Sequence, residues 1–201
     1  DIAEVLSLAS HMIVMGEGHV VEEGSPARVL ASPTSVFAAR LAGLNIVAGA
    51  AVVRPGLVGV RVGEGALWAA ADSPESETET AGAGREGADA ARGADAGSPE
   101  PLPSSPAGEP ARVALTFPPE AVALSREESH SSPRSVLPGV VAGVDVDGSL
   151  VSARVALAGG VSVSARVTAS GWADLGLGVG DSLWVSVKAT QVRAIRVAAG
   201  S

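Results

Sequence analysis

Apolar and polar residues alternate along several stretches in the last third of the chain. In the stretches 150–157, 161–168 and 182–189, Val, Leu or Ala occupies nearly every second position. A period of two places one set of side chains on a buried face and the other in solvent, as in a half-buried antiparallel strand. Because Gly-rich turns separate these stretches, the pattern predicts a small closed or nearly closed antiparallel β-barrel. Further strands are expected at 136–146 and 192–197, with one helical turn near 170–175.

The middle of the chain has a different composition. Short β segments are predicted at 46–53, 57–62, 66–70, 113–116 and 121–124. Between them, residues 72–111 carry nine acidic and two basic side chains, and Leu102 is the only bulky aliphatic. Such a segment cannot bury enough apolar surface to offset the entropy of ordering. We therefore predict that 72–111 is a disordered insertion within a β module.

The first 43 residues have local signals for a mixed α/β segment. An apolar stripe predicts a helix over residues 2–8, and two short apolar runs around the turn 16–18 predict a β pair. Ser25 followed by Pro26 is typical of a helix start, with serine as N-cap and proline at the first helical position. A second helix is expected from Ser35 to Ala42, ending at Gly43.

Composition excludes several classes of function. The net charge of −8 and the absence of clustered Lys and Arg argue against nucleic acid as a partner. With no cysteine and three histidines, thiolate or histidine sites for metal cations are not expected. No nucleophile–base pair or paired acid emerges, so this chain is not expected to be an enzyme. No apolar run reaches the ~18 residues of a membrane span.

Residues 131–201 form the only segment with a positive balance, six basic against four acidic side chains. Two clusters in it offer hydrogen-bond donors: Ser131-Ser-Pro-Arg134-Ser135 before a strand, and Lys188-Ala-Thr190 at a strand end. Lys188 is the only lysine in the chain. Cationic groups and hydroxyls together suit a tetrahedral oxyanion. The alternative is that Arg134 and Lys188 are solvated charges that protect edge strands from aggregation.

The same segment resembles a known family. The runs Ser132-Pro-Arg-Ser-Val-Leu-Pro-Gly139, Val167-Thr-Ala-Ser-Gly-Trp-Ala-Asp-Leu-Gly-Leu177 and Gly180-Asp-Ser-Leu-Trp-Val-Ser-Val-Lys-Ala-Thr190 resemble, in this order, the molybdate-binding Mop/TOBE domain. The resemblance implies an OB-like antiparallel barrel over 131–197 that binds molybdate or tungstate. It departs from the family pattern where Ser135 replaces an Asn and where Gly171 aligns with the family's central Ser. The site residues implied are Ser132, Arg134, Ser135, Ser170, Lys188, Ala189 and Thr190.

Residues 1–48 carry a second resemblance, to the last part of an ABC transporter nucleotide-binding domain. The phosphate-binding motif Gly-x-x-x-x-Gly-Lys-Ser/Thr is absent from the chain, so ATP binding of the P-loop kind is not expected. Together the two resemblances imply a remnant of an ABC ATPase domain at 1–45, a first TOBE-like β module at 46–126 interrupted by the insertion, and the oxyanion-binding barrel at 131–197.

This organisation describes the ATP-binding subunit of a molybdate importer. It implies a regulatory oxyanion-binding domain, an ABC permease partner and a cytoplasmic location, including one peripheral to the inner face of the cell membrane. Because the interior of so small a barrel is filled by its own side chains, the anion is expected at an interface in a homodimer or higher oligomer. The alternatives are a stand-alone molybdate-storage protein and a structural TOBE domain of a sulfate- or sugar-type importer.

Overall fold

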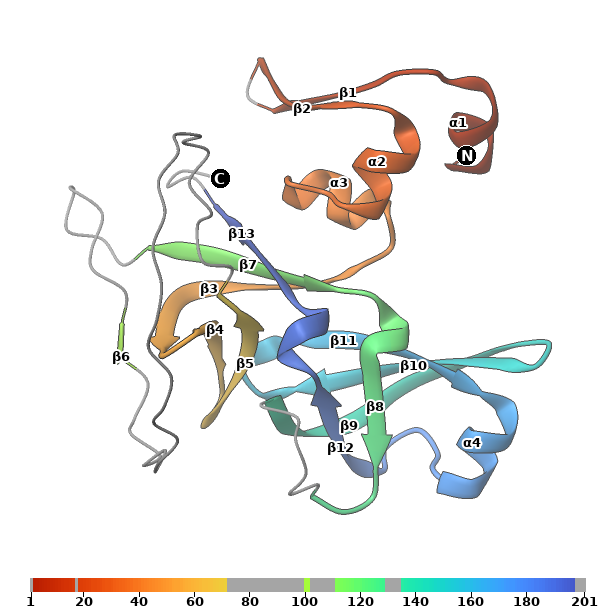
Figure 1. The fold of residues 1–201 in the computed structure, drawn as a ribbon. Coiled ribbons are helices and arrows are strands. Elements are labelled where there is room, and N and C mark those ends of the chain that lie inside the picture. The colour runs from red at the N-terminus through yellow and green to blue at the C-terminus, as the bar shows by residue number, and fades with distance from the viewer. Residues whose placement is uncertain (1, 17, 72–99, 102–110, 129–134, 198–201) are drawn as a thin grey trace, which may run out of the picture.

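The computed structural model describes residues 2–16, 18–71, 100–101, 111–128 and 135–197 (Figure 1). Most of the predicted disordered insertion, at 72–99 and 102–110, lies outside these residues. Within it, Glu100–Pro101 form the short strand β6, which pairs with Val52 and Val53. No helix in the described ranges is long and apolar enough to cross a membrane.

The N-terminal unit forms the elements that its local signals predict. They are α1 (Ile2–Leu8), β1 (Met12–Gly16), β2 (His19–Gly24), α2 (Pro26–Ala31) and α3 (Val36–Leu41). Ser25 and Ser35 are the N-caps of α2 and α3, and the Ser35 Oγ accepts the Ala38 N–H at 3.1 Å. The unit has a small core of Val14, Val29 and Ala38. The prediction for this segment is confirmed nearly to the residue.

One contact in this unit is not visible in the sequence pattern. Glu22 is buried in β2, and its carboxylate accepts the backbone N–H groups of Thr34 and Ser35. It also accepts the Ser35 hydroxyl at 3.2 Å. A buried carboxylate is tolerated because several donors compensate the loss of water. Glu22 therefore fixes the start of α3 on the β1–β2 hairpin.

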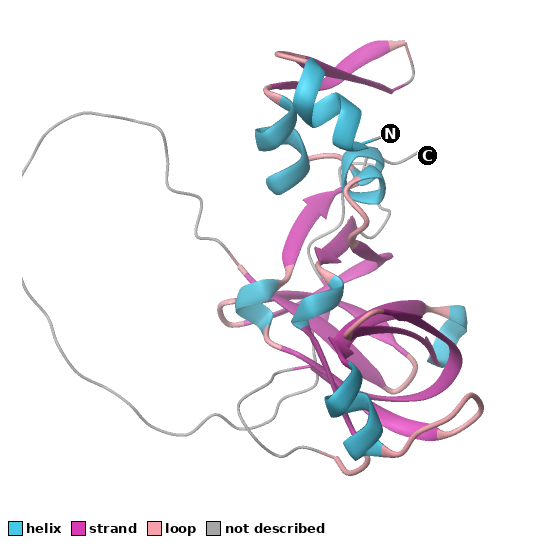
Figure 2. Cartoon of the chain, turned by 90° about the vertical axis from the view of Figure 1, so that its right-hand side faces the viewer, coloured by secondary structure: helices cyan, strands magenta, loops and turns pink. Residues whose placement is uncertain are grey.

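Two antiparallel sheets make up the rest of the structure. The first has the order β13-β7-β3-β4-β5, with β6 beside β3, and the second has the order β11-β10-β9-β12-β8. Figure 2 shows the curled sheets at one end of the molecule and the helices of the N-terminal unit at the other. The strands of the first sheet are β3 (Asn45–Arg54), β4 (Leu57–Val62), β5 (Gly65–Ala70), β7 (Arg112–Phe117) and β13 (Arg193–Arg196). Those of the second are β8 (Val122–Ser125), β9 (Ser135–Asp147), β10 (Leu150–Leu157), β11 (Ser162–Thr168) and β12 (Ser182–Val187).

The predicted alternation holds in the second sheet. In β10, Val151, Ala153, Val155 and Leu157 are buried, while the residues between them are half-buried or exposed. The predicted helical turn is α4 (Ala169–Leu175), which ends at Gly176 in the left-handed conformation. The mainly β prediction is confirmed, and the curled antiparallel sheets are consistent with an OB-like barrel.

The two sheets exchange strands (Figure 1). After β7, the 3-10 turn Pro119–Ala121 carries the chain to β8, which pairs with β12 of the second sheet. After β12, the 3-10 turn Ala189–Gln191 carries it back to β13, which pairs with β7 of the first sheet. One core runs through both sheets and includes Leu67 and Phe117 from the first and Leu137 and Val185 from the second. The predicted modules 46–126 and 131–197 are thus interlocked.

Candidate functional site

The strand pairing places Ser135, the last residue of one predicted donor cluster, beside the strand end that precedes the other cluster. β9 begins at Ser135, which pairs with Val187, the last residue of β12. Lys188 follows Val187 directly, and Arg134 precedes Ser135 in the sequence. Ser132 and Arg134 lie outside the described residues. The register therefore places the start of β9 beside the end of β12, which Lys188 follows directly.

Ser135 is not a solvent-facing donor. It is 1% exposed, and its Oγ accepts the backbone N–H of Trp68 in β5 at 2.8 Å. This bond joins the second sheet to the first. The described structure gives Ser135 a role in holding β9 against β5, and direct contact of its hydroxyl with an anion stays a prediction.

The Lys188–Thr190 segment presents its side chains in two directions. Lys188 and Thr190 are exposed, whereas Ala189 is 8% exposed and packs against Val52 and Trp68. The backbone closes as a 3-10 turn, in which the Gln191 N–H donates to the Lys188 carbonyl at 2.9 Å. An ammonium and a hydroxyl thus stand in solvent on a turn whose middle residue is anchored. Both can donate to an oxyanion.

Ser170 lies elsewhere in the barrel. It is exposed in the first turn of α4, and its Oγ is 3.5 Å from the Oγ1 of Thr168, the N-cap of that helix. Thr168 pairs with Leu150, which pairs with Asp147 at the far end of β9 from Ser135. The pairing therefore places Ser170 and Lys188 at opposite ends of β9 within one chain.

Trp68, one of the few aromatic residues of the chain, is 3% exposed. Sequence reasoning missed its place beside the predicted site, between Ser135 and Ala189. The guanidinium of Arg54 lies 4.8 Å from the centroid of its ring, within the range of a cation–π contact. The distance of 67 residues between Trp68 and Ser135 leaves no local signal that could have revealed this contact.

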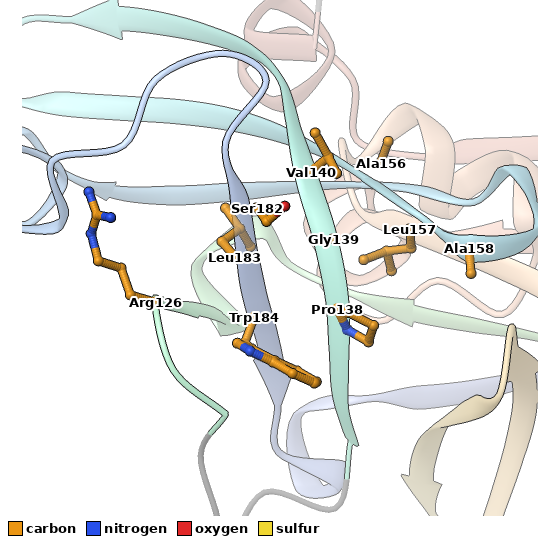
Figure 3. A pocket seen from close by; sticks show the side chains of 10 residues that line it. All are labelled: Arg126, Pro138, Gly139, Val140, Ala156, Leu157, Ala158, Ser182, Leu183 and Trp184. Atoms are coloured by element: carbon orange, nitrogen blue, oxygen red, sulfur yellow. The ribbon is translucent and has the colours of Figure 1, made fainter.

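A separate groove of about 510 Å³ lies on the β9–β12 pair (Figure 3). Pro138, Leu157 and Trp184 make its lining mostly apolar. Arg126 reaches its edge, but the Nε and Nη2 of Arg126 donate to the carbonyls of Leu175 and Gly176 at the end of α4. Of the predicted site residues that the structure describes, none lines the groove. Because the guanidinium of Arg126 is engaged in these hydrogen bonds, the groove is a poor oxyanion site.

Among the described residues, no group of three or more His, Cys, Asp or Glu side chains could hold a metal cation. Lys188 is an exposed cation on the turn, and the guanidinium of Arg54 lies over Trp68, which packs in one cluster with Ala189. Cationic and hydroxyl donors without clustered carboxylates suit an anion better than a metal ion.

Comparisons with known proteins agree with the fold and with the family. The TOBE domain family matches residues 131–194. Over 194 residues the chain is 31% identical to the molybdenum import ATP-binding protein ModC of Mycobacterium tuberculosis, in the strains CDC 1551 / Oshkosh and ATCC 25618 / H37Rv. The aligned region covers 96% of this chain and 43% of each relative, so the chain spans less than half the length of the curated relatives it matches.

Among solved structures, the fold is similar to that of the cytoplasmic molybdate-binding protein ModG with molybdate bound. The TM-score is 0.52 at 19% sequence identity, over 76% of this chain and 96% of that one. At this identity the likeness concerns the fold. Residues 131–194 thus match the TOBE domain family, in a chain similar in sequence to part of the molybdenum import ATP-binding protein.

Proposed function

We propose that this chain binds molybdate, as the regulatory part of the ATP-binding subunit of an ABC-type molybdate importer. The observation that carries the proposal is the exposed pair Lys188 and Thr190 on an anchored turn beside the start of β9. These positions coincide with the Mop/TOBE resemblance, and the ModG structure with a similar fold holds molybdate. Ser132, Arg134, Ser135 and Ser170 complete the proposed oxyanion site, and tungstate is an alternative ligand of the same geometry.

Regulation follows if the bound anion favours one state of the importer. A ligand shifts an equilibrium only by the difference between its affinities for the two states. Molybdate would bind on the cytoplasmic side when its concentration in the cell is sufficient. The bound anion would then favour one conformation of the subunit relative to its permease partner. The proposed location is cytoplasmic, peripheral to the inner face of the membrane through that permease. The proposed domains remain 1–45, 46–126 and 131–197.

The anion is proposed to lie between two copies of the chain. Ser170 and Lys188 are both exposed, but the strand pairing places them at opposite ends of β9. The second sheet of a single chain therefore does not bring both donors to one anion. Two copies related by a twofold axis could place α4 of one beside the Lys188 turn of the other.

Calorimetric titration of the chain with molybdate, tungstate and sulfate tests the proposal. We expect saturable binding of molybdate and tungstate, accompanied by a dimer or larger assembly in sedimentation. A chain that binds none of these oxyanions contradicts the proposed function. A chain that binds tightly while remaining a monomer at every concentration contradicts the intersubunit site alone.

ATP gives a second prediction for the same protein. Since no phosphate-cradling glycine loop with its lysine is present in the chain, we expect neither ATP hydrolysis nor nucleotide binding above background. Equilibrium dialysis with ATP and Mg²⁺ measures this directly. Saturable ATP binding at micromolar concentration would contradict it.

A further inference from the structure

Trp68 contacts both strand ends that meet at the proposed site. Its backbone N–H donates to the buried Ser135 Oγ at 2.8 Å, which holds the start of β9. Its side chain packs with Ala189, the anchored residue between Lys188 and Thr190. One residue of the first sheet therefore touches the segments on both sides of the Ser135–Val187 pair.

The side chain of Trp68 does not belong to the main core. The large cluster that joins the two sheets includes Leu67 and Ala69, the neighbours of Trp68 in β5. Trp68 instead forms a separate small cluster with Val52 and Ala189. A tryptophan that served only to fill the barrel would be expected among the large cluster. Its side chain is instead buried together with Ala189, the middle residue of the turn that carries Lys188.

The indole ring is itself held in place. It lies over Gly59, the residue paired with Trp68 across β4 and β5, where a Cβ atom would come within 2.6 Å of the ring carbon Cε3. The guanidinium of Arg54 lies over the ring at 4.8 Å. Clamped in this way, the ring has little freedom to shift, and the turn that rests on it is fixed with it.

We propose that Trp68 is a positioning residue of the oxyanion site: it fixes the Lys188–Thr190 turn relative to the start of β9. This inference rests on the proposed function. Residues that orient the ligands of a bound ion change its affinity without touching it, because donors must stand in the right geometry before the ion arrives. Trp68 does so here across the junction between the two sheets.

The first test is the affinity of side-chain variants for sodium molybdate, measured by calorimetry. Trp68→Leu is expected to weaken binding about tenfold, the lower end of the range for residues that orient ion ligands. Trp68→Phe should recover part of the loss because it restores a ring against Ala189. Trp184→Leu is the matched control: it makes the same change at the groove of Figure 3, and parental affinity is expected.

The second test reads Trp68 directly and does not depend on the stability of Trp68→Leu. The chain has three tryptophans, so the double variant Trp172→Phe/Trp184→Phe leaves Trp68 as the only one. Neutralisation of Lys188 by a doubly charged anion changes the electric field at the neighbouring ring. We expect the emission of Trp68 to change saturably as molybdate is added. The midpoint of this change should equal the midpoint of the calorimetric titration.

The outcomes separate the two proposals. If the parent chain binds molybdate but Trp68→Leu binds it equally well, the positioning role is wrong and the proposed function stands. The same conclusion follows if the double variant binds molybdate with no change in Trp68 emission. If the parent chain binds no molybdate, both proposals fall.

Discussion

Phe117→Ala is expected to lower the free energy of unfolding by about 3–5 kcal/mol, the usual cost of removing a fully buried phenylalanine. Phe117 is 1% exposed and is the last residue of β7, directly before the turn that crosses to β8 in the other sheet. It packs in the core that both sheets share. A cavity there should loosen the junction of the sheets as well as remove apolar contacts. Urea unfolding followed by tryptophan emission measures the effect, since Trp68 and Trp184 lie in these sheets and Trp172 packs against their shared core.

The chain supplies a matched control, because its only other phenylalanine is Phe37. Phe37 is 63% exposed on α3, so the same substitution there should change the unfolding free energy by about 0.5 kcal/mol or less. Equal effects of the two substitutions would show that Phe117 is not in a tightly packed core.

Lys188→Ala and Arg134→Ala are each expected to weaken molybdate binding by about tenfold to a hundredfold. A charge-assisted donor contributes about 1.5–3 kcal/mol when it is partly desolvated. For Lys188 the expectation rests on its exposed position on the anchored turn, and for Arg134 on the family resemblance. Lys188→Arg should also lose affinity, because a planar guanidinium does not replace a compact ammonium at a tetrahedral ligand. Calorimetric titration gives the affinities.

The control for these variants is Arg61→Ala, which removes a positive charge from an exposed position on β4. It should leave both affinity and melting temperature nearly unchanged. Lys188→Ala should also keep the parental melting temperature without ligand, since its side chain is exposed. The site is wrong if both alanine variants bind molybdate as the parent does. Lys188 and Arg134 would then be the solvated edge charges of the alternative interpretation.

The parts of the fold that depend on near neighbours could be predicted from the sequence. Ser25 and Ser35 cap α2 and α3 because their hydroxyls accept N–H groups only three residues away. The strand at 150–157 was predicted at its observed bounds because alternation is a property of the strand alone. Such signals need no knowledge of the rest of the chain.

Strand partners could not be predicted in this way. The sequence at 192–197 predicts a strand, but nothing in it indicates that β13 pairs with β7 instead of a neighbour in the barrel. The prediction of the site residues was limited in the same way, because it also depends on which strands are neighbours. Ser135 was predicted as an anion donor from the resemblance, whereas the structure engages its hydroxyl with Trp68, 67 residues away. Only the arrangement of β5 beside β9 reveals that bond.

The exchange of strands has a consequence for how the protein is made. β7 finds its partner β13 across a separation of 77 residues, and Asn45 reaches the β11 backbone across 119. Contacts so distant in sequence slow folding, because a long loop must close before any of them forms. On the ribosome, the first sheet cannot be completed until the second has been synthesised. During that interval the edge of β7 is unpaired and apolar, so it can pair with other chains. Protection by a chaperone against aggregation would matter most in this period.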